Sequence, residues 1–280
     1  MSILITGGRG KIARAVHAGL VAQGRDVRVA SREPGDRLGA IALNPADPVS
    51  LATALDGITQ VFLYADPATA ELFVEAAETA GVKQVVLLSS LSAQADSGNG
   101  SEDLAGDPHI GAERVIAGGA YATTRLQPGT FMSNAIFWSY QLRASGQIRL
   151  PYLDAEEAPI HEQDIADVAL KVLLDGPGGA HDGAVYPMTG PESMTRRHQL
   201  GLITEVTGVP VEVVELTPDQ AFEEMSSTMR DPARLALLMA YWASRVGSPH
   251  PLEQTVELVT GHPARTFTQW LHDNPTVYSN

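Results

Sequence analysis

The first half of the chain alternates short apolar runs with segments whose apolar residues recur at helical spacing. Apolar runs without alternating polar positions are typical of parallel strands that helices cover on both faces. This pattern predicts strands at Ile3–Thr6, Val27–Ser31, Ala40–Leu43, Gln60–Tyr64, Val85–Ser89 and Ala122–Leu126. The helices between them are expected at Lys11–Gln23, Pro48–Leu55, Pro67–Ala80 and from Asp107-Pro108 to Gly118-Gly119.

Strands that alternate with helices predict an α/β fold, a doubly wound parallel sheet whose ligands bind beyond the carboxyl ends of the strands. The second half of the chain is less regular. Its expected elements are strands at Ile148–Leu150 and Val185–Pro187 and helices at Ile165–Leu174, Gln199–Val206, Ala233–Arg245 and Thr266–Leu271. We expect residues 1–130 to form the ligand-binding core, joined by a late strand near 184–188. Residues 131–280 are expected to form mainly a smaller C-terminal substrate lobe.

The chain has 280 residues, of which 44% are hydrophobic and 19% charged, so it can bury a core. Its net charge of −14 and pI near 4.9 argue against a nucleic-acid partner but allow a local basic site. It contains no cysteine, which excludes thiolate nucleophiles and Cys-zinc sites. No apolar run is long enough to span a bilayer, and the segment after Met1 does not resemble a secretory signal. We therefore expect a cytoplasmic protein without a membrane partner.

A glycine-rich turn, Thr6-Gly7-Gly8-Arg9-Gly10-Lys11-Ile12-Ala13, follows the first strand and opens the first helix. There, Gly7 allows a tight turn, and Gly10 lets the backbone approach a pyrophosphate at the positive end of the helix. The spacing is G-x-x-G-x-x-A rather than the strict dinucleotide fingerprint. The alternative is a glycine turn that holds no ligand. The residues predicted to contact a dinucleotide here are Thr6, Gly7, Arg9, Gly10, Lys11 and Ile12.

The end of the second strand selects between NAD(H) and NADP(H). NAD sites place an Asp or Glu there for the ribose 2′-hydroxyl, whereas this chain has Ser31 followed by Arg32. Together with Arg9 from the glycine turn, Arg32 can make charge-assisted contacts to a 2′-phosphate. The sequence therefore favours NADP(H) over NAD(H). The alternative is that one or both arginines are solvated surface residues, and Glu33 can occupy Arg32.

Seven short motifs carry a family resemblance. They are Thr6–Ile12, Val85–Ser90, His109–Glu113, Thr124–Phe131, His161–Ala166, Thr189–Glu192 and Thr260–Phe267. In this order they resemble the NmrA-like branch of the short-chain dehydrogenase/reductase superfamily, over almost the whole chain. This branch includes NADPH-dependent quinone and dye reductases, isoflavone-reductase-like enzymes and redox-sensing regulators without turnover. The resemblance implies that residues 1–130 form a Rossmann-type NAD(P)-binding core.

The resemblance also implies where the nicotinamide and the substrate bind. The ends of the fourth, fifth and sixth strands would line the nicotinamide through Tyr64, Ala65, Ser89, Pro128 and Phe131. The segment from about Ser133 to Pro159, with the C-terminal helices, would form the substrate lobe. Its implied apolar lining is Phe131, Met132, Trp138, Tyr140 and Tyr152, each of which also fits a plain core role.

The chain lacks the Tyr-x-x-x-Lys pair of typical superfamily members, in which the Tyr donates the proton. The three lysines, Lys11, Lys83 and Lys171, have Gly7, Thr79 and Asp167 four positions before them. The family's Lys position is taken by His109 and its Tyr position by Ala105. His109 is therefore the main catalytic candidate, with Ser89 as a second, and Glu113 can pair with His109. The alternative is a structural His–Glu pair that anchors the helix to the sheet.

Three other signals are set aside. His161-Glu162 starts like a zinc-protease helix, but Ile165 stands where the second His is required, and the other histidines lack ligand spacing. We therefore predict no metal. Ser89 is not part of a Gly-x-Ser-x-Gly elbow, which argues against an esterase. Arg196-Arg197-His198 fits a solvated helix start better than a nucleic-acid patch.

These observations predict an NADPH-dependent reductase that transfers hydride to a small conjugated or aromatic carbonyl acceptor such as a quinone. The missing Tyr and Lys leave two other functions open. One is a non-enzymatic NADP(H) sensor that acts through a protein partner, and the other is a redox-neutral isomerase, cyclase or dehydratase on the same scaffold. A homodimer is compatible with the family, although no segment shows a distinct interface signal.

Overall fold

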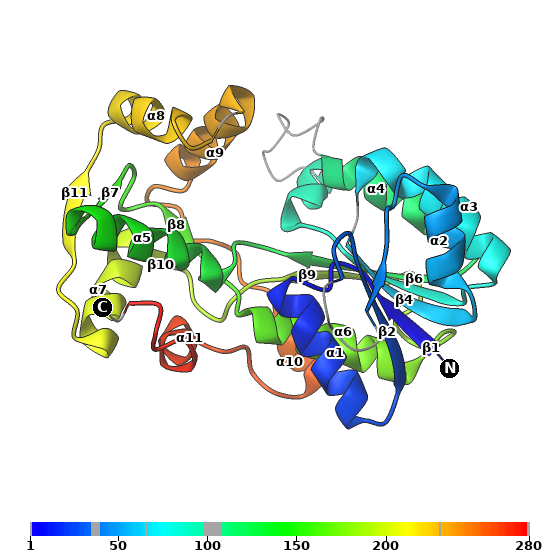
Figure 1. Cartoon of the computed structure of the whole chain (residues 1–280). Helices are drawn as coiled ribbons and strands as arrows, with labels where there is room; N and C mark the ends of the chain where they lie inside the picture. The colour runs from blue at the N-terminus through cyan, green and yellow to red at the C-terminus, as the bar shows by residue number, and fades with distance from the viewer. Residues whose placement is uncertain (1, 35–39, 65, 98–107, 230, 279–280) are drawn as a thin grey trace. The chain divides into compact units, whose positions relative to one another are not determined.

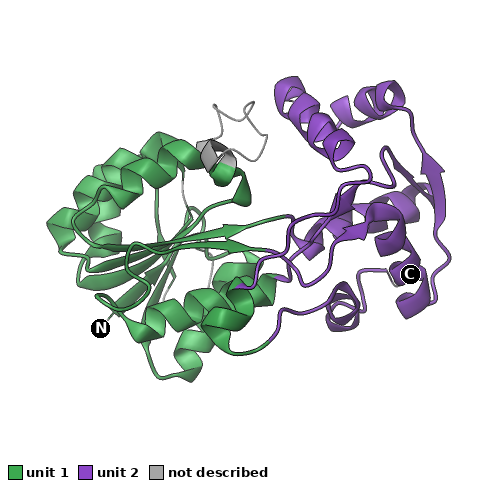
Figure 2. Ribbon diagram, turned by 180° about the vertical axis from the view of Figure 1, so that it is seen from behind, with its two compact units in different colours: residues 1–129, 162–188, 255–262 green, residues 130–161, 189–254, 263–280 purple. Residues whose placement is uncertain are grey.

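The computed structural model describes residues 2–34, 40–64, 66–97, 108–229 and 231–278. The chain forms two compact units (Figure 1, Figure 2). Unit 1 comprises residues 1–129, 162–188 and 255–262, and unit 2 comprises residues 130–161, 189–254 and 263–280. The chain therefore returns to unit 1 twice after residue 129.

Unit 1 is built on a seven-stranded parallel sheet with the strand order β3-β2-β1-β4-β5-β6-β9. Its strands are β1 (Ser2–Ile5), β2 (Asp26–Ser31), β3 (Ala40–Ala42), β4 (Ile58–Tyr64), β5 (Gln84–Leu88), β6 (Ala122–Pro128) and β9 (Val185–Met188). The order reverses between β1 and β4, which is the switch point where such sheets bind ligands. The predicted doubly wound α/β fold is confirmed, and the predicted strands lie close to their expected bounds.

Helices cover both faces of the sheet (Figure 1). Every residue of β5 is buried, as a cover on both faces requires. The predicted helix from Pro67 starts as a 3₁₀ turn, η1 (Pro67–Thr69), which Asp66 caps by accepting from Ala68 N. One face carries α2 (Pro48–Leu55), α3 (Ala70–Ala80) and α4 (Pro108–Ala117), and the other carries α1 (Lys11–Ala22), α6 (Glu162–Asp175) and α10 (Thr255–Thr260).

Helix α6 belongs to unit 1, whereas the sequence predicted that only a strand near 184–188 returns there. The reason is packing between α6 and α1. Gly19 lacks a side chain, and a Cβ atom there would lie 2.6 Å from Leu170 Cδ2. Val16, Leu20 and Val172 are fully buried and complete the core on this face of the sheet. Without α6, the apolar residues of α1 would remain exposed to water.

A polar clamp fixes β9 beside β6. His181 Nδ1 lies 2.7 Å from Tyr186 Oη, and His181 Nε2 lies 2.9 Å from Asp175 Oδ2. Thr124 Oγ1 on β6 donates to His181 O at 2.7 Å. Hydrogen bonds from Lys171 and, to a smaller extent, His181 hold the pKa of Asp175 below its usual value. The clamp links the end of α6 to both β6 and β9.

Unit 2 combines two small sheets with helices around two apolar cores. In the sheets, β7 (Gln147–Leu150) pairs with β11 (Glu212–Glu215) in parallel, and β8 (Glu156–Glu157) pairs with β10 (Met194–Thr195) antiparallel. The helices are α5 (Ile136–Ser145), α7 (Arg196–Thr207), α8 (Pro218–Ser226), α9 (Pro232–Ser244) and α11 (Phe267–Asp273). Within the described residues of both units, no helix has the length and apolar character that crossing a membrane requires.

Candidate functional site

The glycine turn forms between β1 and α1, as predicted. Gly7 adopts a φ of +65°, which favours glycine, and Gly10 N donates to Gly7 O at 2.8 Å. Gly8 N donates to Ala30 O at 3.1 Å and so ties the turn to the end of β2. Gly10 caps α1 without a side chain, and the first turn of the helix carries no acidic residue. No acidic side chain of that turn therefore neutralises the positive end of the helix, which attracts anions.

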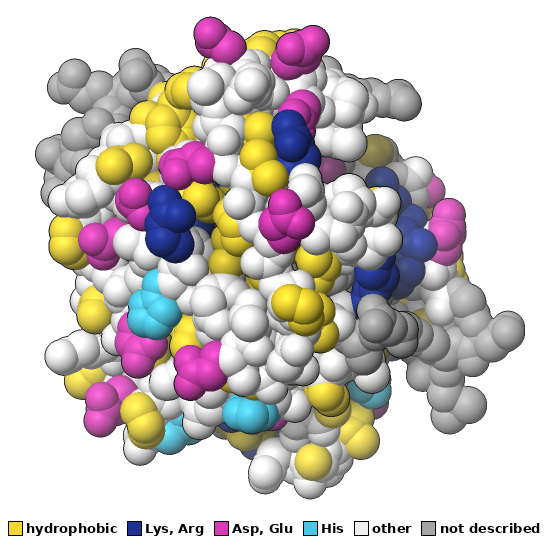
Figure 3. All heavy atoms as spheres, turned by 90° about the vertical axis from the view of Figure 1, so that its left-hand side faces the viewer, with side chains coloured by type: hydrophobic (Ala, Val, Ile, Leu, Met, Phe, Trp, Pro, Cys, Tyr) yellow, Lys and Arg dark blue, Asp and Glu magenta, His cyan; other side chains and the backbone are white. Residues whose placement is uncertain are grey.

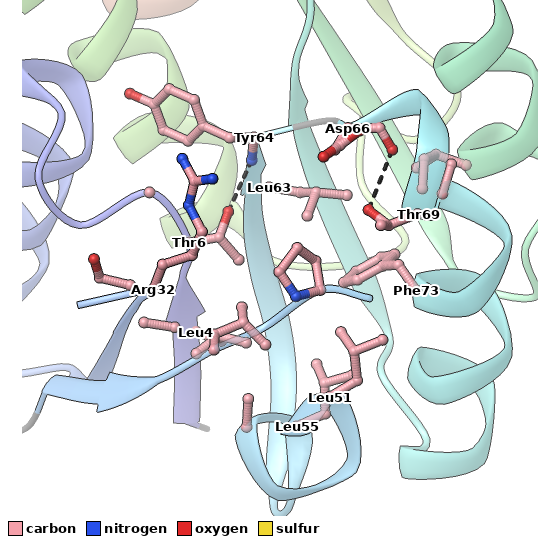
Figure 4. A pocket seen from close by; sticks show the side chains of 18 residues that line it. Leu4, Thr6, Arg32, Leu51, Leu55, Leu63, Tyr64, Asp66, Thr69 and Phe73 are labelled. Atoms are coloured by element: carbon pink, nitrogen blue, oxygen red, sulfur yellow. Dashed lines mark hydrogen bonds between the residues drawn. The ribbon is translucent and has the colours of Figure 1, made fainter. Parts of the chain in front are cut away.

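Tyr64, at the end of β4, packs directly against this turn. Thr6 Oγ1 accepts from Tyr64 N at 2.8 Å (Figure 4). A Cβ atom on Gly7 would lie 2.7 Å from Tyr64 Cδ2, and one on Gly10 would lie 2.9 Å from Tyr64 Oη. Burial raises the pKa of Tyr64 to about 12, and a hydrogen bond with the Ala13 backbone opposes this rise. Tyr64 thus lies on the side of the glycines from which a pyrophosphate approaches such a turn.

A cavity of about 250 Å³ opens beside the turn, at the switch point of the sheet. Its wall is mainly apolar with a few polar side chains (Figure 4). Such a lining suits a flat heterocycle that has a few polar atoms. The apolar lining includes Leu4, Ala30, Leu43, Leu51, Leu55, Leu63 and Phe73, and the polar lining includes Thr6, Ser31, Arg32, Asp66 and Thr69.

The two arginines predicted to bind a 2′-phosphate differ in their surroundings. Arg9 Nη1 pairs with Glu33 Oε2 at 2.9 Å, and both side chains are exposed. Glu33 therefore engages Arg9, and not Arg32 as the sequence suggested. Arg32 lines the cavity beside Ser31 and has no hydrogen-bond partner among the described residues. Of the two arginines, Arg32 is the better placed to contact an anion in the cavity.

The remaining predicted cofactor contacts are spread between surface and core. Lys11 is exposed at the start of α1, whereas Ile12 is buried in the core and offers only its backbone to a ligand. Pro128 ends β6 and is buried. Ala65 lies outside the described residues, as does Ala105, the residue at the family's Tyr position.

The predicted pair of His109 and Glu113 is wrong. Glu113 is buried on α4 and accepts from Gln127 Nε2 with its two carboxylate oxygens, at 2.8 and 3.0 Å. Arg125 lies 3.9 Å from the same carboxylate. Glu113 thus faces the sheet, while His109 is half-buried near the start of α4. The sequence analysis did not single out Gln127. Its one signal in the sequence is that it is a polar residue at the buried end of a strand.

Ser89 follows β5 and lies at the carboxyl edge of the sheet. Its backbone N donates to Leu126 O at 2.8 Å. Its Oγ is buried and has no hydrogen-bond partner in the described structure, and the same holds for Oε1 of Gln127 on the neighbouring strand. Buried hydroxyl and amide oxygens are normally paired, so both are candidates to meet a ligand or a water.

The predicted substrate-lining residues mostly fill the cores of unit 2. Met132 and Trp138 are buried in one core, and Tyr152, with a φ of +51°, packs against the other. Phe131 is half-buried and forms a β-bridge with Ile160. Tyr140 is 58% exposed, so unit 2 by itself gives it no apolar pocket. The core role therefore accounts for Met132 and Trp138.

Potential metal ligands gather at the start of α6 in unit 1. Ligand atoms of Asp164, Asp167 and His262 lie within 4.8 Å of one another. His262 Nε2 lies 3.3 Å from Asp167 Oδ2, and Gln163 Nε2 donates to Asp167 Oδ1 at 2.8 Å. All three candidate ligands have further interactions in the structure. Polar contacts within the protein thus already engage them, and the absence of a metal stays a prediction.

The segment Arg196-Arg197-His198 is only partly the solvated helix start that the sequence predicted. Arg197 is exposed and pairs with Asp154 at 2.9 Å and with Glu215 at 3.2 Å. On the face shown in Figure 3, acidic and basic side chains are interspersed. Arg196, in contrast, is 3% exposed, and its guanidinium lies over the ring of Trp242 at 4.1 Å from the centroid. The prediction is wrong for Arg196, because its burial depends on a distant tryptophan.

A family model described as NAD(P)H-binding matches residues 7–176, a segment that starts in the glycine turn and ends just after α6. The chain belongs to this NAD(P)H-binding family. Among solved structures, an NADPH-dependent quinone oxidoreductase from Escherichia coli, in complex with NADPH, superimposes with a TM-score of 0.79 at 22% identity. That match covers 97% of this chain and 99% of the other.

Two relatives of the NAD(P)H-binding chain have names that state an activity. A (4-alkanoyl-5-oxo-2,5-dihydrofuran-3-yl)methyl phosphate reductase from Streptomyces griseus subsp. griseus is 30% identical over 286 residues, which cover 99% of each chain. An NAD(P)H azoreductase from Xenophilus azovorans is 30% identical over 231 residues, 80% of this chain and 78% of its own. Together with the family model, these relatives confirm the predicted relationship to NAD(P)H-dependent reductases and the oxidoreductase class. The solved structures confirm the Rossmann-type fold.

Proposed function

We propose that the chain is an NADPH-dependent reductase that transfers hydride to a small conjugated or aromatic carbonyl compound such as a quinone. The observation that carries this proposal is the cavity at the switch point, which adjoins the glycine turn and has Arg32 in its wall. When bound, NADPH supplies the hydride. The residues of the chain then have two tasks, to hold the cofactor and to orient the acceptor.

The residues at the switch point fit the adenosine end of a dinucleotide. The cavity of about 250 Å³ is smaller than the roughly 300–1,000 Å³ of pockets that enclose a whole ligand. Ser31 and Arg32 lie in its wall, and the N–H fork of a guanidinium matches a phosphate. The pyrophosphate would bind at Gly10 after the Tyr64 side chain moves aside.

We assign the acceptor to the carboxyl ends of β5 and β6, near Ser89 and Pro128, with His109 on α4 as the orienting or proton-relaying group. The Ser89 hydroxyl, buried and without a described partner, can donate to a carbonyl oxygen. A conjugated acceptor needs little help from an acid, because its oxyanion is stabilised by delocalisation, which suits a chain without a Tyr-x-x-x-Lys pair. The names of the two relatives also specify conjugated acceptors, an azo compound and an unsaturated furanone.

The decisive experiment is a titration of the purified protein with NADPH and NADH, followed by nicotinamide absorbance in the presence of a panel of quinones. We expect tighter binding of NADPH and oxidation that depends on the quinone. Binding without oxidation would contradict the reductase and favour the sensor or the redox-neutral enzyme. If neither nucleotide binds, the interpretation of the glycine turn itself is wrong.

The cofactor preference is tested with Arg32→Gln. We expect the Kd for NADPH to rise about tenfold or more and the Kd for NADH to stay unchanged, because only NADPH carries the 2′-phosphate. The matched control is Arg25→Gln, which removes an exposed arginine in the turn between α1 and β2. Equal losses for the two nucleotides would contradict the role of Arg32.

A further inference from the structure

A buried polar group in unit 2 has no role in the proposed reaction so far. It contains Arg196, whose guanidinium lies over the Trp242 ring and whose Nη1 donates to Pro151 O at 2.8 Å. Its Nε is buried without a hydrogen-bond partner in the described structure. A guanidinium has five N–H donors, and a buried donor that meets no acceptor is costly. The unpaired edge of Arg196 therefore requires an explanation.

A second arginine of unit 2, Arg245, also has a buried Nε without a hydrogen-bond partner in the described structure. It follows α9, one helical turn after Trp242, and its carbonyl oxygen accepts from Glu156 N at 3.0 Å. Its Nη2 donates to Ser248 O at 2.7 Å, while its Nε is buried and unpaired. Within the described residues, neither Arg245 nor Arg196 forms an ion pair with a carboxylate. Two guanidinium groups of unit 2 thus have buried donors without acceptors.

Glu157, Thr130 and Tyr241 complete the group. The pairing of β8 with β10 places Glu157 opposite Met194, two residues before Arg196. Thr130 Oγ1 donates to Glu157 Oε1 at 3.4 Å, and Thr130 also hydrogen-bonds to the Tyr241 hydroxyl. Burial, with a smaller contribution from Glu157, raises the pKa of Tyr241 to about 12. The phenol therefore stays protonated at neutral pH and can donate a hydrogen bond.

The two guanidinium groups lack a close carboxylate partner. Glu157 acts on Arg196 electrostatically and opposes the effect of burial on its pKa, but no ion pair forms at Arg196 or Arg245 within the described residues. A buried charge without a partner is strongly unfavourable in a protein. Thr130, Tyr241 and Arg245 are only partly buried, so a ligand can approach the group from that side. An anion there would supply the missing acceptors and the missing negative charge.

We propose that Arg196, Arg245 and Tyr241 bind an oxyanion ligand within unit 2, either a phosphate monoester or a carboxylate. Guanidinium N–H groups match the oxygens of both anions. The site does not depend on the proposed reaction, because all of its residues belong to unit 2.

The test measures the binding of inorganic phosphate and of acetate by calorimetry, with the full chain saturated with NADP⁺ to fill the phosphate sites of the cofactor. We expect Arg245→Gln to weaken binding about tenfold or more and Tyr241→Phe about two- to tenfold. The control, Arg197→Gln, removes a neighbouring exposed arginine and should change nothing. Preference for phosphate indicates a phosphate monoester as the ligand, and preference for acetate a carboxylate.

Three results would overturn the proposal: no anion binding to the wild type, no loss in either variant, or an equal loss in Arg197→Gln.

Discussion

The hydroxyl of Tyr64 lies 2.9 Å from the point where a Cβ atom on Gly10 would stand. The ring of Tyr64 lies 2.7 Å from the corresponding point on Gly7. Glycine at these two positions is therefore needed for a contact within the protein, before any ligand is considered. Since a pyrophosphate would approach the same side of the turn, Tyr64 and the cofactor compete for this space.

This competition predicts that Tyr64→Phe binds NADPH about two- to tenfold more tightly than the wild type. The variant loses the hydrogen bond with the Ala13 backbone that the cofactor must otherwise displace. A fluorescence titration with NADPH measures the change. Tyr186→Phe removes the hydroxyl of the His181 clamp and serves as the control with unchanged affinity. Weaker binding by Tyr64→Phe would mean that the hydroxyl contacts the cofactor directly.

His109→Ala is expected to lower kcat at least tenfold while changing the Kd for NADPH by less than threefold, because we assign His109 to the acceptor. Steady-state kinetics with a quinone and a separate NADPH titration distinguish the two effects. Glu113→Gln is the comparison variant, since Glu113 bonds to Gln127 and not to His109. An unchanged kcat in His109→Ala excludes the assigned role.

The variant Ser89→Ala tests whether the Ser89 hydroxyl has a functional or a structural role. The Ser89 Oγ has no partner in the described structure, so its removal should leave the free energy of unfolding within about 0.5 kcal/mol of the wild type. If the hydroxyl orients the acceptor, kcat/KM should fall about tenfold. Thr123→Val removes another buried, unpaired hydroxyl on β6 and is expected to change neither quantity. Loss of stability in Ser89→Ala would contradict this interpretation.

Gly190→Ala should destabilise the protein by about 3 kcal/mol, at the upper end of what overpacking costs. A Cβ atom on Gly190 would lie 1.9 Å from Pro159 O, and a backbone atom cannot move aside as the end of a side chain does. Gly201→Ala in α7 meets nothing within 4 Å and should stabilise by about 0.5–1 kcal/mol. Urea unfolding of both variants provides the comparison, and equal stabilities would refute the backbone contact.

The Asp175 carboxylate makes the stability of unit 1 depend on acid pH. Its pKa is lowered in the folded state, first by Lys171 and then by His181. A lowered folded pKa stabilises the protein above the unfolded pKa of about 3.9, and this contribution is lost as the pH falls. Asp175→Asn should therefore be less stable than the wild type at pH 7, and the difference should shrink by pH 3. Asp182→Asn, in the turn before β9, is the control, and a difference independent of pH contradicts the prediction.

Local patterns in the sequence were sufficient for the sheet of unit 1. The apolar run around Val85 indicates a strand that is buried on both faces, because such a strand admits few polar residues. The glycines after β1 indicate a tight turn, because a positive φ favours glycine. The cavity wall was only partly predictable. The position of Arg32 directly after β2 identified it as a candidate. Whether Glu33 forms its ion pair with Arg9 or with Arg32 depends on side-chain geometry, which the sequence does not show.

Unit 2 was predicted least well, because its elements depend on distant contacts. The sequence did not indicate α5, whose residues Ile136–Ser145 are rich in aromatic side chains that are common in strands. The short strands β8 and β10 exist only through their mutual pairing. Arg196 looked like a surface residue, since nothing near it in the sequence reveals that Trp242 covers its guanidinium.

The discontinuous course of the chain restricts how this protein can be recombined. Cutting after residue 129 would remove α6, β9 and α10 from unit 1. The backbone edge of β6 would then lie open, and the apolar side of α1 would face water, a combination that favours aggregation. A chimera that exchanges unit 2 between relatives must therefore transplant three separate segments together, so unit 2 cannot be exchanged as one continuous piece of the chain.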